Sequence, residues 1–72
     1  MDRVDLEKLV YKTVQDNPRI EIADVCMRTG IDFELVKDIL YSFYKRKMIK
    51  LEEVKDEENL GKFLHFFFFG GL

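Results

Sequence analysis

Residues 20–49 read IEIADVCMRTGIDFELVKDILYSFYKRKMI and decide the fold. Their apolar residues recur at the three- and four-residue spacing of helices, first over 22–28 and then over 32–47. Gly30 stands between the two runs and supplies the positive φ that closes a helix at its C-terminus. Asp32 occupies the N-cap position of the second run. The stretch therefore predicts two short helices joined by a tight turn.

The two predicted helices each have an apolar face that points to a common core. In the first helix the inward residues are Ile22, Val25 and Cys26, with Met27 partly covered. In the second helix the core residues are Val36, Ile39, Leu40 and Phe43. The outward face of the second helix carries the residues Phe33, Glu34, Lys37, Asp38 and Tyr41.

The segments on either side complete a small domain. Apolar residues at helical spacing predict another helix over 5–16, which Asp2 or Asp5 caps and which ends at Asn17-Pro18. Arg19-Ile20-Glu21 is too short for a helix and predicts a minimal strand.

The region after the second helix of the quoted stretch reads as a hairpin. Residues 48–54 alternate between apolar and polar, KDEENLG provides a turn, and the aromatic-rich segment 62–69 predicts the return strand. Gly70-Gly71-Leu72 is expected to be a frayed end.

Composition narrows the class of protein. Seventy-two residues, 47% hydrophobic and 36% charged, fit one small globular domain. The net charge of −2 argues against binding to nucleic acid through the overall field, so any DNA contact needs a local basic patch. Abundant Lys, Glu and Ile without Trp would suit a thermophilic or archaeal protein.

Some kinds of site and of cellular location are not expected. Cys26 is the single cysteine and His65 the single histidine, which excludes an intrachain disulfide and a four-ligand Cys/His metal site. Cys26 is expected to be structural and His65 to be a strand residue. The N-terminus lacks the pattern of a signal peptide, and the longest apolar run is too short to span a bilayer, so we expect a cytoplasmic protein without membrane contact.

The order of these elements resembles the winged helix-turn-helix family of transcriptional regulators. The residues that carry the resemblance are Ile20, Ala23, Val25, Cys26, Gly30, Ile31, Val36, Leu40, Phe43 and Ile49. The resemblance covers residues 1–72 as a single winged-helix domain. It implies an α+β fold in which three helices precede a two-stranded β-wing over 48–69, with the helix at 32–47 as the recognition helix.

The resemblance also implies that the protein is a small regulator of transcription that reads duplex DNA. Neither enzymatic activity nor a cofactor is expected, because the sequence has no Gly-rich phosphate loop, nucleophile elbow or paired-carboxylate site. The residues expected to contact DNA are Phe33, Glu34, Lys37, Asp38, Tyr41, Lys45, Arg46, Lys50 and Lys55. Two of them are acids that the DNA polyanion repels. Glu34 would be tolerated by the helix dipole, Asp38 would be neutralised by its neighbour Lys37, or each would accept a hydrogen bond from cytosine.

Other interpretations stay open at the level of the sequence. The acids of the recognition helix, with Asp56, Glu57 and Glu58 in the wing, also fit a solvated face or a module that binds a protein partner through Phe33 and Tyr41. The basic residues fit dipole complementation as well as phosphate contact. Successive strand residues point to opposite faces, so Phe67 and Phe69 share one face of the return strand and would join two chains in a homodimer.

Overall fold

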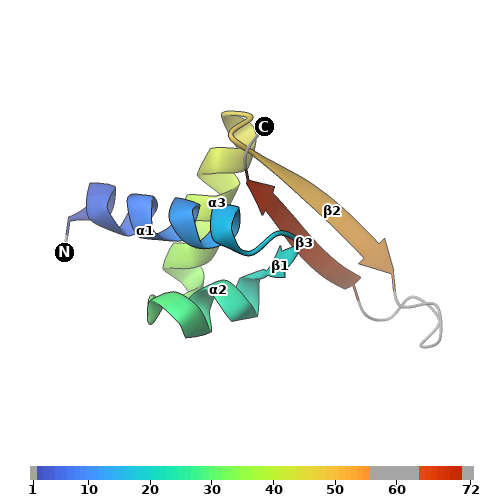
Figure 1. Cartoon of the computed structure of the whole chain (residues 1–72), viewed down its shortest axis with the longest axis horizontal. Coiled ribbons are helices and arrows are strands. Elements are labelled where there is room, and N and C mark those ends of the chain that lie inside the picture. The colour runs from blue at the N-terminus through green and yellow to red at the C-terminus, as the bar shows by residue number, and fades with distance from the viewer. Residues whose placement is uncertain (1, 56–63, 71–72) are drawn as a thin grey trace.

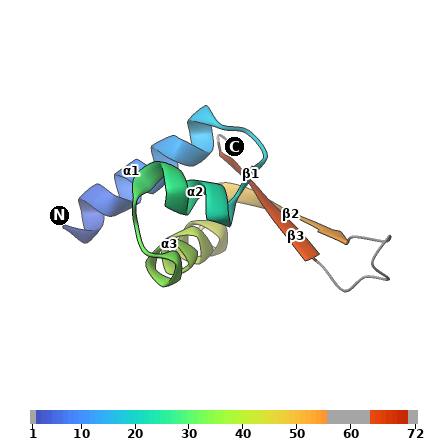
Figure 2. The same cartoon turned by 90° about the horizontal axis from the view of Figure 1, so that it is seen from below.

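The computed structural model describes residues 2–55 and 64–70, and structural statements below refer to these residues. The helices are α1 (Arg3–Asp16), α2 (Ile22–Thr29) and α3 (Phe33–Lys45). The strands are β1 (Ile20–Glu21), β2 (Ile49–Lys55) and β3 (Leu64–Gly70). Together they form a small α+β fold with three helices and one antiparallel sheet, from which the β2–β3 ladder extends away from the helices (Figures 1 and 2).

The sheet has three strands in the order β1-β3-β2, so the last strand in the chain lies in the middle. The prediction of a two-stranded wing was therefore incomplete. The minimal strand predicted at residues 19–21 exists as β1, and it pairs with β3 in the register that places Ile20 opposite Phe68. Leu51 of β2 lies opposite Phe68 from the other side. Phe67 and Phe68 of β3 therefore have a paired strand on both sides. Phe68 is buried in the core.

Gly70 is not part of a frayed end. It pairs with Ile49 at the end of the β2–β3 ladder. A Cβ atom at this position would lie 2.9 Å from Cγ of Gln15 and 3.1 Å from its backbone, so the glycine allows α1 to approach β3 closely. Gly71 and Leu72, which were also predicted to fray, lie outside the described residues.

The core is built from the predicted apolar faces. Val25, Val36, Ile39, Leu40 and Phe43 are all buried. They join residues from α1 and the sheet, which are Val10, Val14, Ile20, Ile49 and Phe68. The inward faces predicted for α2 and α3 are thus confirmed for these five residues.

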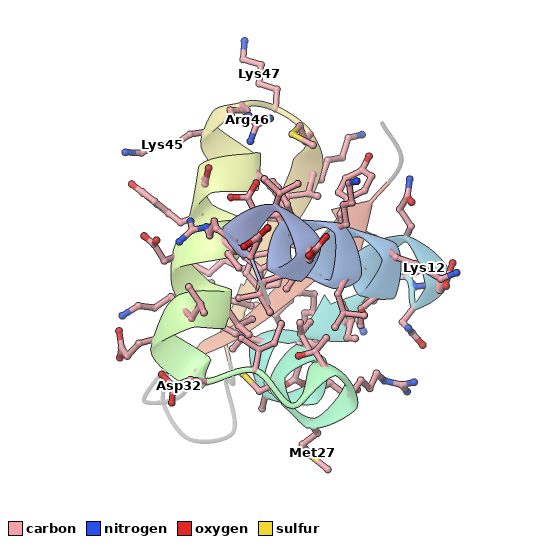
Figure 3. All side chains as sticks on the ribbon, turned by 90° about the vertical axis from the view of Figure 1, so that its left-hand side faces the viewer. Lys12, Met27, Asp32, Lys45, Arg46 and Lys47 are labelled. Atoms are coloured by element: carbon pink, nitrogen blue, oxygen red, sulfur yellow. The ribbon has the colours of Figure 1, made fainter. Side chains whose placement is uncertain are left out.

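Met27 is the exception on α2, because the prediction that it is partly covered is wrong. Its side chain is 82% exposed and points away from the helix (Figure 3). It follows Val25 by two residues, which is about 200° around a helix of 3.6 residues per turn. With Val25 facing the core, Met27 must face solvent.

The helix ends differ from the predicted ones by up to two residues. α1 begins at Arg3 rather than residue 5, with Asp2 at its N-cap position, and Asp32 is the N-cap residue of α3. Neither Asp2 nor Asp32 makes a side-chain capping hydrogen bond in the described structure. Gly30 adopts φ 71° and donates its N–H to the Cys26 carbonyl at 2.8 Å, as its predicted role requires.

α3 ends at Lys45, two residues before the predicted end. Lys47 adopts φ 60°, its N–H donates to the Tyr44 carbonyl, and the Met48 N–H donates to the Phe43 carbonyl. These two bonds form a Schellman motif, which usually has glycine at the position that Lys47 occupies.

Within residues 2–55 and 64–70, we find no helix whose length and apolar character would let it cross a membrane.

Candidate functional site

The exposed surface of α3 carries two rows of side chains with different chemistry. Phe33, Lys37, Tyr41 and Lys45 follow one another at four-residue intervals, so they lie along one face of the helix. Phe33 is 48% exposed and Tyr41 57% exposed. The ammonium group of Lys45 lies 4.7 Å from the centroid of the Tyr41 ring, close enough for a cation–π interaction. We call these four residues the aromatic-cation row.

The second row consists of the two acids, and the structure pairs both of them. The Glu34 carboxylate forms an ion pair with Nζ of Lys37, at a distance of 3.1 Å. The Asp38 carboxylate accepts a hydrogen bond from the Arg3 guanidinium of α1 at 3.1 Å. Lys37 was predicted to neutralise Asp38, but it reaches Glu34, three residues earlier on the helix. Asp38 instead faces the start of α1.

Arg3 is a site residue that the sequence did not reveal. It also donates to Glu7 of α1 at 2.8 Å, and the hydrogen bonds to Glu7 and then to Asp38 raise the pKa of the guanidinium. Arg3 and Asp38 are 35 positions apart, so no local spacing connects them. The only sequence features that favour this contact are the opposite charges of Arg3 and Asp38 and the position of Arg3 near the start of a helix.

Basic side chains gather where α3 ends and β2 begins. Lys45, Arg46 and Lys47 lie together at the C-terminal end of α3 (Figure 3), and Lys50 follows on β2. All four are exposed, and none of them forms an ion pair with another residue of the described part of the chain. The negative end of the helix dipole favours cations here. We call these four residues the basic end.

A groove of about 350 Å³ lies between the exposed side of α3 and the sheet. Phe33, Tyr41 and Tyr44 line it from α3, and Leu51 and Phe66 line it from the two strands. Its surface is apolar, so Lys37, which also lines it, contributes the methylene groups of its side chain. Tyr44 is 45% exposed and Phe66 is 39% exposed.

Tyr44 was not singled out from the sequence. The available signal was its position three residues after Tyr41, which places both tyrosines on neighbouring parts of one helix face. Three residues of the aromatic-cation row, Phe33, Lys37 and Tyr41, line the groove, whereas Asp38 faces α1.

Phe67 and Phe69, the predicted dimerisation residues, lie on the opposite face of β3 from Phe68, and both are half-buried. The Arg19 guanidinium lies 4.2 Å from the centroid of the Phe67 ring and is held by Glu52 of β2 at 3.2 Å. An arginine therefore covers part of the Phe67 ring within the chain. Among the described residues, no cation lies over the Phe69 ring in the same way.

Cys26 is half-buried against the core rather than fully buried. Burial, and then the negative charge of Asp32, raise the pKa of its thiol above the ordinary value for cysteine. The thiol is therefore protonated at neutral pH, which agrees with a structural role.

Several residues of the predicted wing lie wholly or in part outside the described structure. Lys55 and His65 occupy strand positions, opposite Leu64 and Val54 respectively, but their side chains lie outside the described part. The acids Asp56, Glu57 and Glu58 also lie outside the described residues.

Comparison with known proteins finds no family model that matches the chain and no curated protein with significant sequence similarity to it. The geometry of α3, the basic end and the groove is therefore the basis for assigning a function.

Proposed function

We propose that the chain is a winged-helix protein that binds duplex DNA, as a small transcriptional regulator without enzymatic activity. In this proposal α3 is the recognition helix and the β2–β3 hairpin is the wing. One observation supports it most strongly. Glu34 and Asp38 are paired within the chain, while the four cations of the basic end have no carboxylate partner among the described residues.

The pairing of the acids reduces the main electrostatic objection to DNA binding. An unpaired carboxylate on a recognition helix is repelled by phosphates. Lys37 and Arg3 place a positive charge about 3 Å from each carboxylate, as the ion pairs at 3.1 Å show. The outer surface of α3 then presents Lys37 and Tyr41 toward bases, with Phe33 and the two paired acids beside them.

The basic end would hold the DNA backbone. Lys45, Arg46 and Lys50 are exposed and have long side chains that suit phosphate contacts. Lys47 adds a fourth charge that was not among the predicted contacts. Lys55, on the last position of β2, would contact the backbone from the wing.

A salt titration tests the proposal. Fluorescence anisotropy with labelled random duplexes should show binding at low salt that weakens steeply as salt rises, because bound phosphates release counterions. The double variant Lys45→Ala/Arg46→Ala should make the salt dependence weaker, reducing the magnitude of the slope of log K against log salt by roughly two. The control Lys8→Ala/Lys12→Ala removes the same charge from exposed positions of α1 and should leave the slope unchanged. No binding at low salt, or equal losses in both variants, would contradict the proposal.

A second candidate function is docking of a protein on the outer face of α3. The exposure of Phe33 and Tyr41 favours it, because aromatic rings often anchor protein interfaces. This candidate predicts that Phe33→Ala abolishes binding of a purified partner, and that duplex DNA fails to bind the wild-type protein at low salt. Duplex binding with the expected salt dependence would speak against it.

A further inference from the structure

The groove and the basic end are parts of one continuous surface. The groove of about 350 Å³ exposes the rings of Tyr44 and Phe66. A second, more open hollow of about 560 Å³ is lined by Lys45, Lys47 and Lys50. Tyr44 and Leu51 line both. The apolar groove lined by aromatic rings, which we call the floor, therefore continues directly into the hollow that carries the ammonium groups of Lys45, Lys47 and Lys50, which we call the ledge.

Paired bases in duplex DNA cannot stack on the aromatic rings of this groove. A duplex presents the edges of its bases in the grooves and hides their faces in the stack, so exposed aromatic rings have no face to stack on. An unpaired strand offers base faces and phosphates side by side. Sites for single strands combine these elements, with aromatic rings that stack on bases and cations that track the backbone.

We propose that the groove between α3 and the β2–β3 hairpin binds unpaired bases of a single-stranded DNA segment, which stack on Tyr44, Tyr41 and Phe66. Lys45, Lys47 and Lys50 hold the phosphates of the same segment. This inference rests on the proposed nucleic-acid function and names the form of DNA that fills the groove. Charge complementarity selects this occupant over an apolar peptide, because the ledge at the end of the groove is cationic and unpaired in the described structure.

The intrinsic fluorescence of the protein gives a direct readout. The chain has three tyrosines and no tryptophan. Tyr11 packs edge-on against Phe43, with 5.5 Å between ring centroids, so it lies outside the groove. Emission changes on adding short oligothymidine therefore report Tyr41 and Tyr44. A base stacked on either ring should quench its emission.

Variants at the groove separate stacking from charge. Phe66→Ala should weaken oligothymidine binding by roughly tenfold, the loss expected when one stacked base loses its ring. Its affinity for blunt duplex DNA should stay unchanged, because Phe66 is not among the proposed duplex contacts. Tyr44→Ala is a second variant, used in case Phe66→Ala lowers the melting temperature. Met27→Ala is the control, since it removes an 82% exposed apolar side chain from α2.

The outcomes distinguish the inference from the proposed function. Duplex binding with the expected salt slope, but no tyrosine quenching by oligothymidine, would overturn the inference and leave the proposed function intact. Quenching by oligothymidine without duplex binding would support the inference and overturn duplex recognition. Quenching by an apolar peptide and not by oligothymidine would overturn the inference in favour of a protein ligand.

Discussion

Two cationic residues hold backbone conformations that usually require glycine. Arg19 adopts φ 63° and Lys47 adopts φ 60°. For a residue with a Cβ atom this left-handed region costs about 1–2 kcal/mol. Both side chains have a position that depends on this backbone, since Arg19 covers the Phe67 ring and Lys47 belongs to the basic end. Strained backbone conformations of this kind cluster at functional sites, which agrees with the role proposed for Lys47.

The variant Lys47→Gly tests whether the protein tolerates backbone strain at this position in order to place a positive charge there. Glycine fits the Schellman position without a Cβ penalty, so the free energy of unfolding should rise by about 1 kcal/mol in a urea titration. Affinity for duplex DNA should fall, because a phosphate contact is lost. Gly30→Ala is the reverse control. It adds a Cβ at φ 71°, where no described atom beyond the glycine and its two chain neighbours lies within 4 Å, and should destabilise through backbone strain alone. A Lys47→Gly protein of unchanged stability would refute the argument.

The variant Arg3→Gln tests the pairing of the acid on α3. Removing Arg3 leaves Asp38 without its cation, so duplex affinity measured by anisotropy should fall more than one lost charge explains. Stability should change by less than about 1 kcal/mol, because the pair is exposed. Arg28→Gln is the matched control, since Arg28 is exposed and pairs with Asp24 on α2. Equal losses of affinity in the two variants would show that Asp38 has no particular influence.

At the scale of elements, the two-residue strand β1 has an effect beyond its length. It pairs with Phe67 and Phe68 on one edge of β3 and places Ile20, which is 4% exposed, opposite Phe68 in the core. β1 is followed without a break by α2, so the strand also fixes where α2 begins. The smallest element thus connects the sheet to the helices.

The variant Ile20→Ala measures that connection. Loss of a buried isoleucine side chain should lower the free energy of unfolding by about 2–5 kcal/mol in urea. Amide exchange at Phe67 and Phe68 should accelerate more than exchange in α1, because β1 holds that edge of β3. Val4→Ala on α1 is the control. Val4 is 59% exposed, so its loss should cost no more than about 0.5 kcal/mol. A cost as small for Ile20→Ala would be evidence against this role.

Elements were predictable from the sequence to the extent that local patterns specify them. The spacing of Val36, Ile39 and Leu40, and the single turn glycine Gly30, located α2 and α3 to within two residues. The pairing of β1 with β3 was missed, because two residues carry no periodicity and their partner lies far along the chain. The Arg3–Asp38 contact and the groove were missed for the same reason, since both depend on how distant elements meet.

At the scale of the whole molecule, we propose that the chain forms a homodimer through the outer face of the sheet. Phe67 and Phe69 lie on that face and remain half-buried, and Arg19 covers part of Phe67 only. A two-fold dimer would present two copies of α3 to two half-sites and add their contacts.

Sedimentation at tens of micromolar tests this proposal. The wild-type protein should sediment as a dimer and Phe69→Ser as a monomer, since a hydroxyl replaces the apolar ring at the contact. Phe69 is preferred to Phe67 because its change leaves the Arg19 contact intact. Met27→Ser should remain dimeric, because Met27 lies on α2 and points away from the helix (Figure 3). A wild-type monomer would contradict the proposal.

The central position of β3 has a consequence for how the protein is made. β3 is translated after the other five elements, yet it lies between β1 and β2 and supplies Phe68 to the core. A ribosome adds roughly 5–20 residues per second, so the three helices emerge seconds before the strand that completes their core. Until then their apolar faces are incompletely covered. Folding of this domain should therefore be completed only after β3 leaves the ribosomal exit tunnel, and nascent chains stalled before Leu64 should be targets for chaperones.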